Sequence, residues 1–308
     1  MITSEDVRNE LGRIAPKRAC DRRAELSALF HSAGVLHLRG KGGWSLHLDL
    51  GSGAAARRAL ALLRESGIRS EIRTYRRPAF DRATRYQLHV EGDPEVLRVL
   101  VSAGVVDRRH APLVRPPGRV VGRACCRAAY LRGAFLGGGS ISLGRSPHVE
   151  LRTESLDAAT WLAGLAHDAG FELATAERGG HALAYAKSWD AIESLLVTMG
   201  ASEAALALEE REVVAQTRER ANRLANADHA NLVRTSRSAH AQIEAVRQLR
   251  AAGVLEDLPH ELRDVAELRE RHPSDSLREL AARTEPAVTK AAVHRRLRRL
   301  EELAREQA

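Results

Sequence analysis

Basic side chains are concentrated between residues 277 and 300. This stretch carries seven Lys or Arg against two Glu, a local net charge of +5, whereas the whole chain of 308 residues carries +8. The basic residues are Arg278, Arg283, Lys290, Arg295, Arg296, Arg298 and Arg299. Such groups neutralise phosphates, and Arg can also donate two hydrogen bonds to guanine O6 and N7. The stretch therefore predicts contact with double-stranded DNA.

Two capped helices are expected to position these side chains. Ser276 precedes the run LRELAARTE, and Glu279 three residues later completes a capping-box pattern. Thr289 is expected to cap a second helix, KAAVHRRLRRLEELARE. The predicted buried stripe of this second helix is Val293, Leu297 and Leu300. A short helix, a tight turn and a longer helix form a helix-turn-helix pattern.

In helix-turn-helix docking, the first turns of the second helix meet base edges and flanking basic residues contact phosphates. The predicted DNA-binding residues are Ser276, Thr289, Lys290, His294, Arg295, Arg298 and Arg299. We expect Lys290, His294 and Arg295 on the base side, with Arg295 as the principal reader. Arg298 and Arg299 are expected on the backbone side. The alternative is an amphipathic helix whose Arg-rich face is merely solvated.

The first two hundred residues contain an internal duplication. The segment CDRRAELSALFHSAGVL from Cys20 matches CCRAAYLRGAFLGGGSI from Cys125 at an offset of 105. The identical pairs are Arg22/Arg127, Leu26/Leu131, Phe30/Phe135 and Gly34/Gly139. After each of these segments, strand-like runs of alternating polarity and helical runs ending in glycine follow in the same order in both halves. The predicted fold is α+β, with each half reading helix, two strands, helix, two strands, helix.

The run from Tyr130 to Ile141, YLRGAFLGGGSI, resembles the signature helix of LAGLIDADG homing endonucleases. The resemblance implies that two signature helices pack side by side at a pseudo-twofold axis. Small residues would allow this close approach, namely Ala28, Ala33, Gly133 and Gly137. It also implies an acid at the end of each helix that holds a divalent metal.

The positions that should carry those acids are Ala33 and Gly138. Neither side chain has an oxygen to offer a hard cation, and His31 and Leu136 nearby do not restore a carboxylate pair. Two-metal phosphodiester cleavage would lack its ligands. We therefore expect no catalytic residues and no metal here. Whether this domain touches DNA is left open, since its basic stretches at 57–58, 73–77 and 108–109 are expected to be solvated.

The remaining composition excludes several other classes of protein. Cys20, Cys125 and Cys126 lack the paired spacing of a zinc site, and their odd number argues against a disulfide framework. We expect ordinary buried thiols and no cofactor. Aromatic residues make up 4%, too few for a single-strand stacking platform. Without an 18-residue apolar run or a signal-peptide pattern, a cytoplasmic location without membrane contact is expected.

Patterning also predicts the organisation of the chain. Residues 203–225 lack Pro and Gly and predict a long helix, which Asn231, Arg234, Thr235 and Ser236 are expected to interrupt. Asn222, Asn226, Asn231 and Arg234 are candidate contact residues, and the alternative is that they are only solvated. A further amphipathic helix is expected at 260–272. The predicted parts are a lead segment at 1–16, the LAGLIDADG-like domain at 17–205 with halves at about 17–106 and 122–205, a linker helix at 206–235, and a helical DNA-binding domain at 236–308 with its helix-turn-helix at about 275–308.

The combination resembles the WhiA family of bacterial transcription regulators across nearly the whole chain. The matching segments are CCRAAYLRGAFLGGGSI, RANRLANADHANLVRTS, LPHELRDVAELRERHPSDSLRELA and VTKAAVHRRLRRL. The resemblance implies a sequence-specific, nucleoid-associated regulator of cell division, chromosome segregation and sporulation septation, with a helix-turn-helix like the promoter-reading domain of sigma factors. It implies promoter DNA as partner, together with a WhiB-like iron–sulfur regulator or RNA polymerase.

One departure from this family bears on the base preference. Family members commonly carry Asn-His-Arg where this chain reads His294-Arg295-Arg296. Two alternatives to a transcription regulator remain open. The chain could be a divergent LAGLIDADG endonuclease, or its first domain could serve as a protein-interaction platform.

Overall fold

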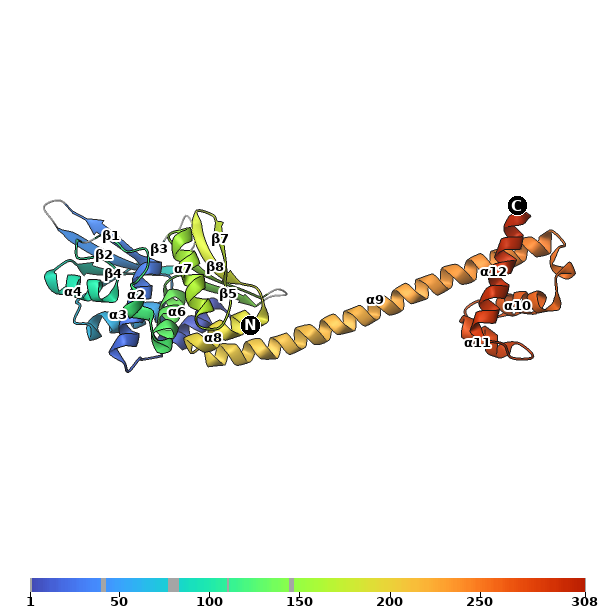
Figure 1. Cartoon of the computed structure of the whole chain (residues 1–308), viewed down its shortest axis with the longest axis horizontal. Helices are drawn as coiled ribbons and strands as arrows, with labels where there is room; N and C mark the ends of the chain where they lie inside the picture. Colours follow the sequence, from blue (N-terminus) through green and yellow to red (C-terminus); the bar gives the residue numbers. More distant parts are fainter. Residues whose placement is uncertain (1, 40–42, 77–82, 110, 144–146, 308) are drawn as a thin grey trace. The chain divides into compact units, whose positions relative to one another are not determined.

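The computed structural model describes residues 2–39, 43–76, 83–109, 111–143 and 147–307 (Figure 1). The chain divides into two compact units, residues 1–215 and 216–308. Each unit has its own hydrophobic core.

The first unit contains the predicted duplication. Its first half consists of α2 (Ala19–Ala33), β1 (Gly34–Leu38), β2 (Trp44–Leu50), α3 (Gly53–Glu65), β3 (Glu71–Arg76), β4 (Thr84–Glu91) and α4 (Pro94–Ala103). Its second half consists of α6 (Ala124–Gly138), β5 (Gly139–Leu143), β6 (Pro147–Thr153), α7 (Leu156–His167), β7 (Ala174–Arg178), β8 (His181–Ala186) and α8 (Trp189–Met199). Helix α1 (Ser4–Gly12) precedes the halves and α5 (Gly118–Val121) joins them. The predicted order of elements is confirmed.

The two antiparallel sheets have the same topology, β1-β2-β4-β3 and β5-β6-β8-β7. Alternation along β2 buries Leu46, Leu48 and Leu50, while His47 and Asp49 between them are only half-buried. One face of each sheet is thereby apolar. Helices α2 and α6 lie between the two sheets (Figure 1), and Ala24 to Phe30 of α2 are all buried. The core of this unit is therefore centred on these two helices.

Small residues set the close contact between α2 and α6, as predicted. A Cβ atom at Gly133 would lie 2.8 Å from Cβ of Ala28 and would collide with the carbonyl oxygen of Glu25. A Cβ atom at Gly137 would collide with the side chain of Ser32. The backbones can approach this closely only because glycine has no side chain there.

A buried ion triad also joins the two halves. The Glu25 carboxylate on α2 accepts hydrogen bonds from Arg58 of α3 and Arg132 of α6, each at 2.8 Å. Glu25 is fully buried, and the two arginine side chains are less than a tenth exposed. The carboxylate is therefore positioned by contacts that neither half can make alone. This triad was not predicted from the sequence.

Glycines end the helices in the predicted manner. Gly67, Gly104, Gly170 and Gly200 all have positive φ, between 72° and 98°, as left-handed C-terminal residues do. Gly34 and Gly139 are different, because each is extended and leads directly into a strand. A Cβ atom at Gly34 would lie only 3.0 Å from Cα of Phe30. The turn from each central helix into its sheet therefore requires glycine.

The second unit is entirely helical. It contains most of α9 (Ser202–Ala251), the short 3₁₀ turn η2 (Leu255–Asp257), α10 (His260–Arg271), α11 (Leu277–Arg283) and α12 (Lys290–Glu306). The predicted interruption at 231–236 is wrong, since α9 continues through these residues. The physical reason is that Asn, Thr and Ser cost a helix only about 0.7 kcal/mol or less each, whereas Pro and Gly, the strong breakers, are absent from this stretch.

The core of the second unit is built from one apolar stripe of each helix. Val293, Leu297 and Leu300 of α12 are buried, which confirms the predicted stripe. They pack with Val246 and Leu249 of α9, Val265 of α10 and Leu280 of α11. Within the described ranges, none of the helices combines the length and hydrophobicity needed to cross a lipid bilayer.

Candidate nucleic-acid interface

The predicted caps begin both helices of the helix-turn-helix. Ser276 Oγ accepts a hydrogen bond from the Glu279 N–H at 3.3 Å, and the Glu279 carboxylate accepts one from the Ser276 N–H at 2.7 Å. These bonds lower the pKa of Glu279, the backbone N–H of Ser276 being the largest cause. Thr289 Oγ1 accepts from the Ala292 N–H at 3.2 Å. The first turns of α11 and α12 are therefore fixed by side chains of the predicted set.

The turn between α11 and α12 is held by Thr284. Its hydroxyl donates to the Ala281 carbonyl at 2.9 Å and accepts from the Val288 N–H at 3.0 Å. Thr284 is buried, so water does not compete for these bonds. They connect the end of α11 to the approach to α12 and so restrict the angle between the two helices.

Arg296 holds α12 against α10 and is not part of the exposed face. Its guanidinium lies 2.8 Å from the Glu261 carboxylate, and its side chain is 21% exposed. Lys290, His294 and Arg298, spaced four residues apart, are exposed instead. Residues four apart lie along one face of a helix. The geometry of α12 thus separates a structural arginine from a free polar face.

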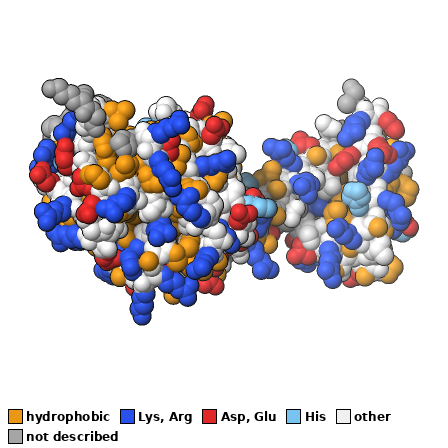
Figure 2. Space-filling model, turned by 60° about the vertical axis from the view of Figure 1, so that its left-hand side comes forward, with side chains coloured by type: hydrophobic (Ala, Val, Ile, Leu, Met, Phe, Trp, Pro, Cys, Tyr) orange, Lys and Arg blue, Asp and Glu red, His pale blue; other side chains and the backbone are white. Residues whose placement is uncertain are grey.

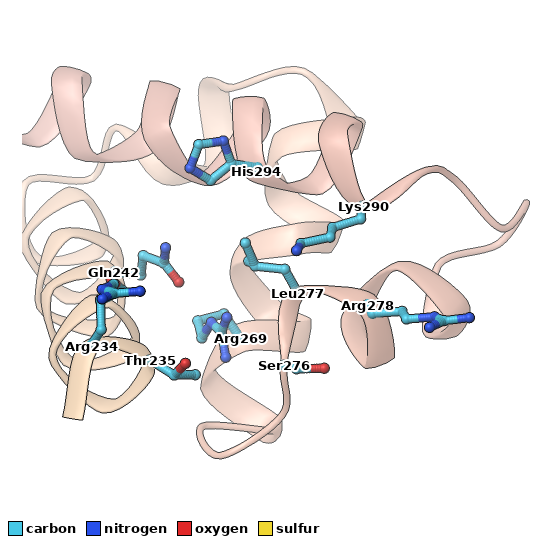
Figure 3. Close-up of a pocket in the computed structure, with 10 residues that line it drawn as sticks. Arg234, Thr235, Gln242, Arg269, Ser276, Leu277, Arg278, Lys290 and His294 are labelled. Atoms are coloured by element: carbon cyan, nitrogen blue, oxygen red, sulfur yellow. The ribbon is translucent and has the colours of Figure 1, made fainter. Parts of the chain in front are cut away.

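A hollow of about 320 Å³ lies beside this face (Figure 3). Lys290 and His294 reach it from α12, and Arg234, Thr235 and Gln242 reach it from α9. A second hollow of about 260 Å³ shares His294 and Gln242 and is also lined by Arg298. The two hollows therefore follow the predicted reading face of α12 from Lys290 to Arg298.

The hollow is cationic and contains buried polar atoms. Arg234, Arg269, Arg278 and Lys290 line it, and no acidic side chain does so among the described residues. Arg269 is 2% exposed and donates to the Asp275 carbonyl at 2.7 Å. Burial lowers the pKa of Arg269, opposed by Asp275. Arg269 Nε and Gln242 Oε1 have no hydrogen-bond partner within the described part of the chain.

The structure does not gather all seven predicted residues in one place. Ser276, Lys290, His294 and Arg298 line the hollows. Thr289, Arg295 and Arg299 lie outside them, and all three are exposed. Arg298 and Arg299 are partly neutralised, because Glu302 lies 3.5 Å from each of them. Arg295 is exposed as well, and it forms no ion pair with an acidic side chain in the part of the chain that the structure describes.

Sequence reasoning identified only some of the residues that α9 contributes. Arg234 was expected both to interrupt the helix and to be a possible contact residue, whereas Gln242 was not identified. The sequence did contain a signal, because apolar residues recur at 239, 245, 246 and 249, as on one face of a helix. The structure buries all four, together with residue 242 between them. That spacing is typical of a helix with one packed face. No pattern in the sequence indicated that Arg269 and Arg278 would line the hollow.

Basic residues are distributed widely over the second unit. Figure 2 shows Lys and Arg side chains over much of the visible face of this unit, with Asp and Glu among them. Several of the arginines belong to ion pairs on their own helix, such as Arg247–Glu244 and Arg271–Glu267, each at 2.8 Å. The sequence charge of this unit therefore overstates its free cationic surface.

In the first unit, an arginine lies near the end of α6, one of the two positions at which an acid was expected in a LAGLIDADG endonuclease. Ala33 and Gly138 are the last residues of α2 and α6. A Cβ atom at Gly138 would lie 3.3 Å from the Arg152 carbonyl oxygen. Arg8 of α1 donates to the carbonyl of Gly139. Burial lowers the pKa of Arg8, and Glu5, whose carboxylate lies 3.6 Å away, opposes this effect.

Together these features define a class of protein: a duplicated LAGLIDADG-like domain followed by a helix-turn-helix domain. Models of the WhiA N-terminal LAGLIDADG-like domain, the WhiA LAGLIDADG-like domain and the WhiA C-terminal HTH domain match residues 19–105, 127–218 and 221–304. The chain belongs to the WhiA family.

Relatives and solved structures agree with this assignment. The chain is 36% identical over 306 residues to a probable cell division protein WhiA of Heliobacterium modesticaldum, covering 99% of this chain and 96% of that protein. It is 38% identical over 306 residues to one of Frankia casuarinae, covering 98% and 93%. The crystal structure of full-length WhiA from Thermotoga maritima matches with a TM-score of 0.57 at 24% identity, covering 98% and 97%.

Proposed function

We propose that the chain is a sequence-specific, double-stranded-DNA-binding transcription regulator that does not cut DNA. Its targets would be promoters of genes for cell division, chromosome segregation and sporulation septation. Because it would be bound to chromosomal DNA, it would be associated with the nucleoid. The observation that carries the proposal is the exposed cationic face of α12 beside Arg234 of α9. The naming of its relatives as probable cell division proteins supports the biological setting.

The proposed contacts follow from the positions of the side chains along α12. Lys290 is the first residue of α12, and His294 and Arg295 lie in the next turn. The early turns of a recognition helix are the part that enters the major groove. Arg295, which is exposed, is proposed to bond guanine O6 and N7.

The remaining predicted residues are assigned to the DNA backbone. Arg298 and Arg299 lie further along α12 and are proposed to contact phosphates. Ser276 and Thr289, at the starts of α11 and α12, are proposed to lie beside the same backbone. Because phosphate contacts release counterions, binding should weaken steeply with added salt.

The test combines Lys290→Ala with Arg295→Ala in the full chain. Target fragments come from genome-wide crosslinking of the tagged protein, and binding is measured against scrambled fragments. We expect the double variant to lose more than about tenfold in affinity for the targets, because one bidentate base contact is worth about 1–3 kcal/mol. The control is Arg247→Ala with Arg271→Ala, which removes the same charge from exposed, paired sites. Wild-type retention of targets by the Lys290/Arg295 variant at physiological salt would overturn the assignment.

The competing function, DNA cleavage, has a direct assay. A divergent endonuclease should nick supercoiled plasmid in the presence of Mg²⁺ or Mn²⁺. Absence of nicking is expected, since Ala33 and Gly138 offer no ligand and Arg8 lies beside the end of α6. Cation-dependent nicking by the wild-type chain would establish the endonuclease instead.

A partner protein is proposed for the first unit. A WhiB-like iron–sulfur regulator or RNA polymerase would connect DNA binding to transcription. Val35 and Leu38 on β1 are large apolar residues left 49% and 72% exposed. Affinity purification of the tagged full chain from nuclease-treated lysate should recover such a partner. A Val35→Asp/Leu38→Asp variant that recovers it equally would move the contact elsewhere.

A further inference from the structure

Three cysteines and one aspartate meet at the N-terminal ends of α2 and α6. Cys20 and Asp21 belong to the first turn of α2, and Cys125 and Cys126 to the first turn of α6. Their ligand atoms all lie within 4.8 Å of one another. In the part of the chain that the structure describes, this is the one group of three or more His, Cys, Asp or Glu with that geometry.

The duplication explains why these residues meet. Cys20 and Cys125 are equivalent positions, 105 residues apart, in two helices that pack side by side. Ligands so distant in sequence leave no spacing pattern. The expectation of ordinary buried thiols rested on that missing pattern, and the structure brings the thiols together instead.

Three of the six distances within the group match the edges of a tetrahedral metal site, and none of the six exceeds 4.8 Å. Cys125 Sγ lies 3.9 Å from Cys126 Sγ. Asp21 Oδ1 lies 3.6 Å from Cys126 Sγ and 3.4 Å from Cys20 Sγ. A tetrahedron with Zn–S of about 2.3 Å and Zn–O of about 2.0 Å has S···S edges of about 3.8 Å and S···O edges of about 3.5 Å. Little movement is needed for all four atoms to face one ion.

The surroundings favour the anionic ligands that such an ion needs. The group lies at two helix N-termini, whose partial positive charge stabilises thiolates. The Arg18 guanidinium lies beside Cys125, and this contact raises the pKa of Arg18. Arg18 and the helix ends therefore offset part of the negative charge of three thiolates and a carboxylate.

Ion binding at this group must release protons, because a metal ion binds the thiolate and not the thiol. Cys126 is 2% exposed, so its sulfur lies on the buried side of the group.

We propose that Cys20, Asp21, Cys125 and Cys126 form a binding site for one thiophilic divalent cation of the zinc class. With four protein ligands, the site is closed and structural, with no position open for catalysis. It joins the start of α2 to the start of α6 and so clamps the two halves together. It lies at the opposite end of these helices from Ala33 and Gly138, about 20 Å away along a 15-residue helix.

The test is a Co²⁺ titration of the reduced full chain under argon, followed by absorption spectroscopy. Thiolate-bound Co²⁺ gives near-ultraviolet charge-transfer bands and the intense visible bands of tetrahedral coordination. We expect one Co²⁺ per chain, displaced by Zn²⁺, with proton release on binding. Cys20→Ser and Cys125→Ser should each weaken binding by more than about tenfold, since even outer-shell partners are worth that much.

Matched controls separate the thiol group from other sites and from misfolding. Ala124→Ser changes an exposed neighbour on the same turn, and His47→Ala removes a histidine from the cluster of His37, His47 and His89 on the first sheet. Both should keep the wild-type spectrum. Cys20 and Cys125 are half-buried, so their variants remain informative if Cys126→Ser fails to fold.

Three results would overturn the proposal. The first is a reduced wild-type chain without thiolate-to-cobalt bands. The second is binding that disappears with His47→Ala and persists with Cys20→Ser. The third is a chain that binds no ion when reduced and forms a Cys20–Cys125 disulfide in air, which would make the cysteines a redox pair.

Discussion

The hydroxyl group of Tyr130 on α6 lies 3.1 Å from Nδ1 of His31 on α2. On its other side, His31 Nε2 lies 3.0 Å from the Leu113 carbonyl oxygen, which can only accept. Nε2 therefore carries the proton, and Nδ1 accepts from Tyr130. Burial lowers the pKa of His31 to about 4 and raises the pKa of Tyr130. Both side chains are neutral at pH 7, so this pair bridges the two halves through a hydrogen bond and adds no negative charge that could hold a metal ion.

The His31 environment predicts a pH dependence of stability. Because its folded pKa of about 4 is below the unfolded value of 6.5, the unfolded chain binds the proton more readily. The contribution of His31 is complete above pH 6.5 and is lost as the pH falls from 6.5 toward 4. At about 1.4 kcal/mol per pH unit, the loss between pH 6.5 and pH 5 is roughly 2 kcal/mol. Urea unfolding of wild type and His31→Gln at both pH values measures it; equal pH dependence in the two chains would contradict the assignment.

The buried triad predicts a large cost for a small change. Glu25→Gln keeps the shape of the side chain but leaves Arg58 and Arg132 buried without their counter-charge. We expect the free energy of unfolding to fall by about 3–5 kcal/mol, as when one partner of a buried pair is removed. Glu65→Gln is the control, because Glu65 pairs with Arg22 at 3.5 Å and is 42% exposed. That variant should lose less than about 1 kcal/mol in chemical denaturation. Similar losses of unfolding free energy in both variants would show that the buried triad stabilises the fold no more than an exposed ion pair does.

The contact between α2 and α6 predicts opposite signs for two Gly→Ala changes. Gly133→Ala places a methyl group against the Glu25 carbonyl and Ala28, and such overpacking costs about 1–3 kcal/mol. Gly164→Ala in α7 meets nothing within 4 Å and should stabilise the chain by up to about 1 kcal/mol through helix propensity. Thermal unfolding midpoints of the two variants should therefore move in opposite directions. A stabilising Gly133→Ala would mean that the helices can separate without cost.

Much of this fold could be predicted because its signals are local. The pattern of Ser276 and Glu279 identified a helix start, and the repeat of Gly34 at Gly139 identified the duplication. Two features were misjudged for different reasons. Polar side chains at 231–236 suggested a break, although Asn, Thr and Ser cost a helix little and no Pro or Gly is present there. Cys20 and Cys125 were aligned in the duplication but were not recognised as neighbours, because the zinc patterns sought in a sequence have their ligands close together in the chain. Local periodicity predicts elements, whereas a site assembled from two halves appears only once they are packed.

The neutralisation of Arg298 and Arg299 by Glu302 predicts a gain in DNA binding. Glu302→Gln removes the carboxylate that lies 3.5 Å from both guanidinium groups; Arg298 is then available for phosphates, and Arg299 keeps only Glu306, at 3.7 Å. We expect affinity for a target fragment to rise several-fold at low salt, by about 1 kcal/mol, and the gain to shrink as salt screens the added charge. Fluorescence anisotropy across a salt series measures both effects. Glu267→Gln is the control, because it removes the same charge beside Arg271 on α10, outside the predicted reading face. An equal gain in that control would mean that net charge, and not the two arginines of α12, governs binding.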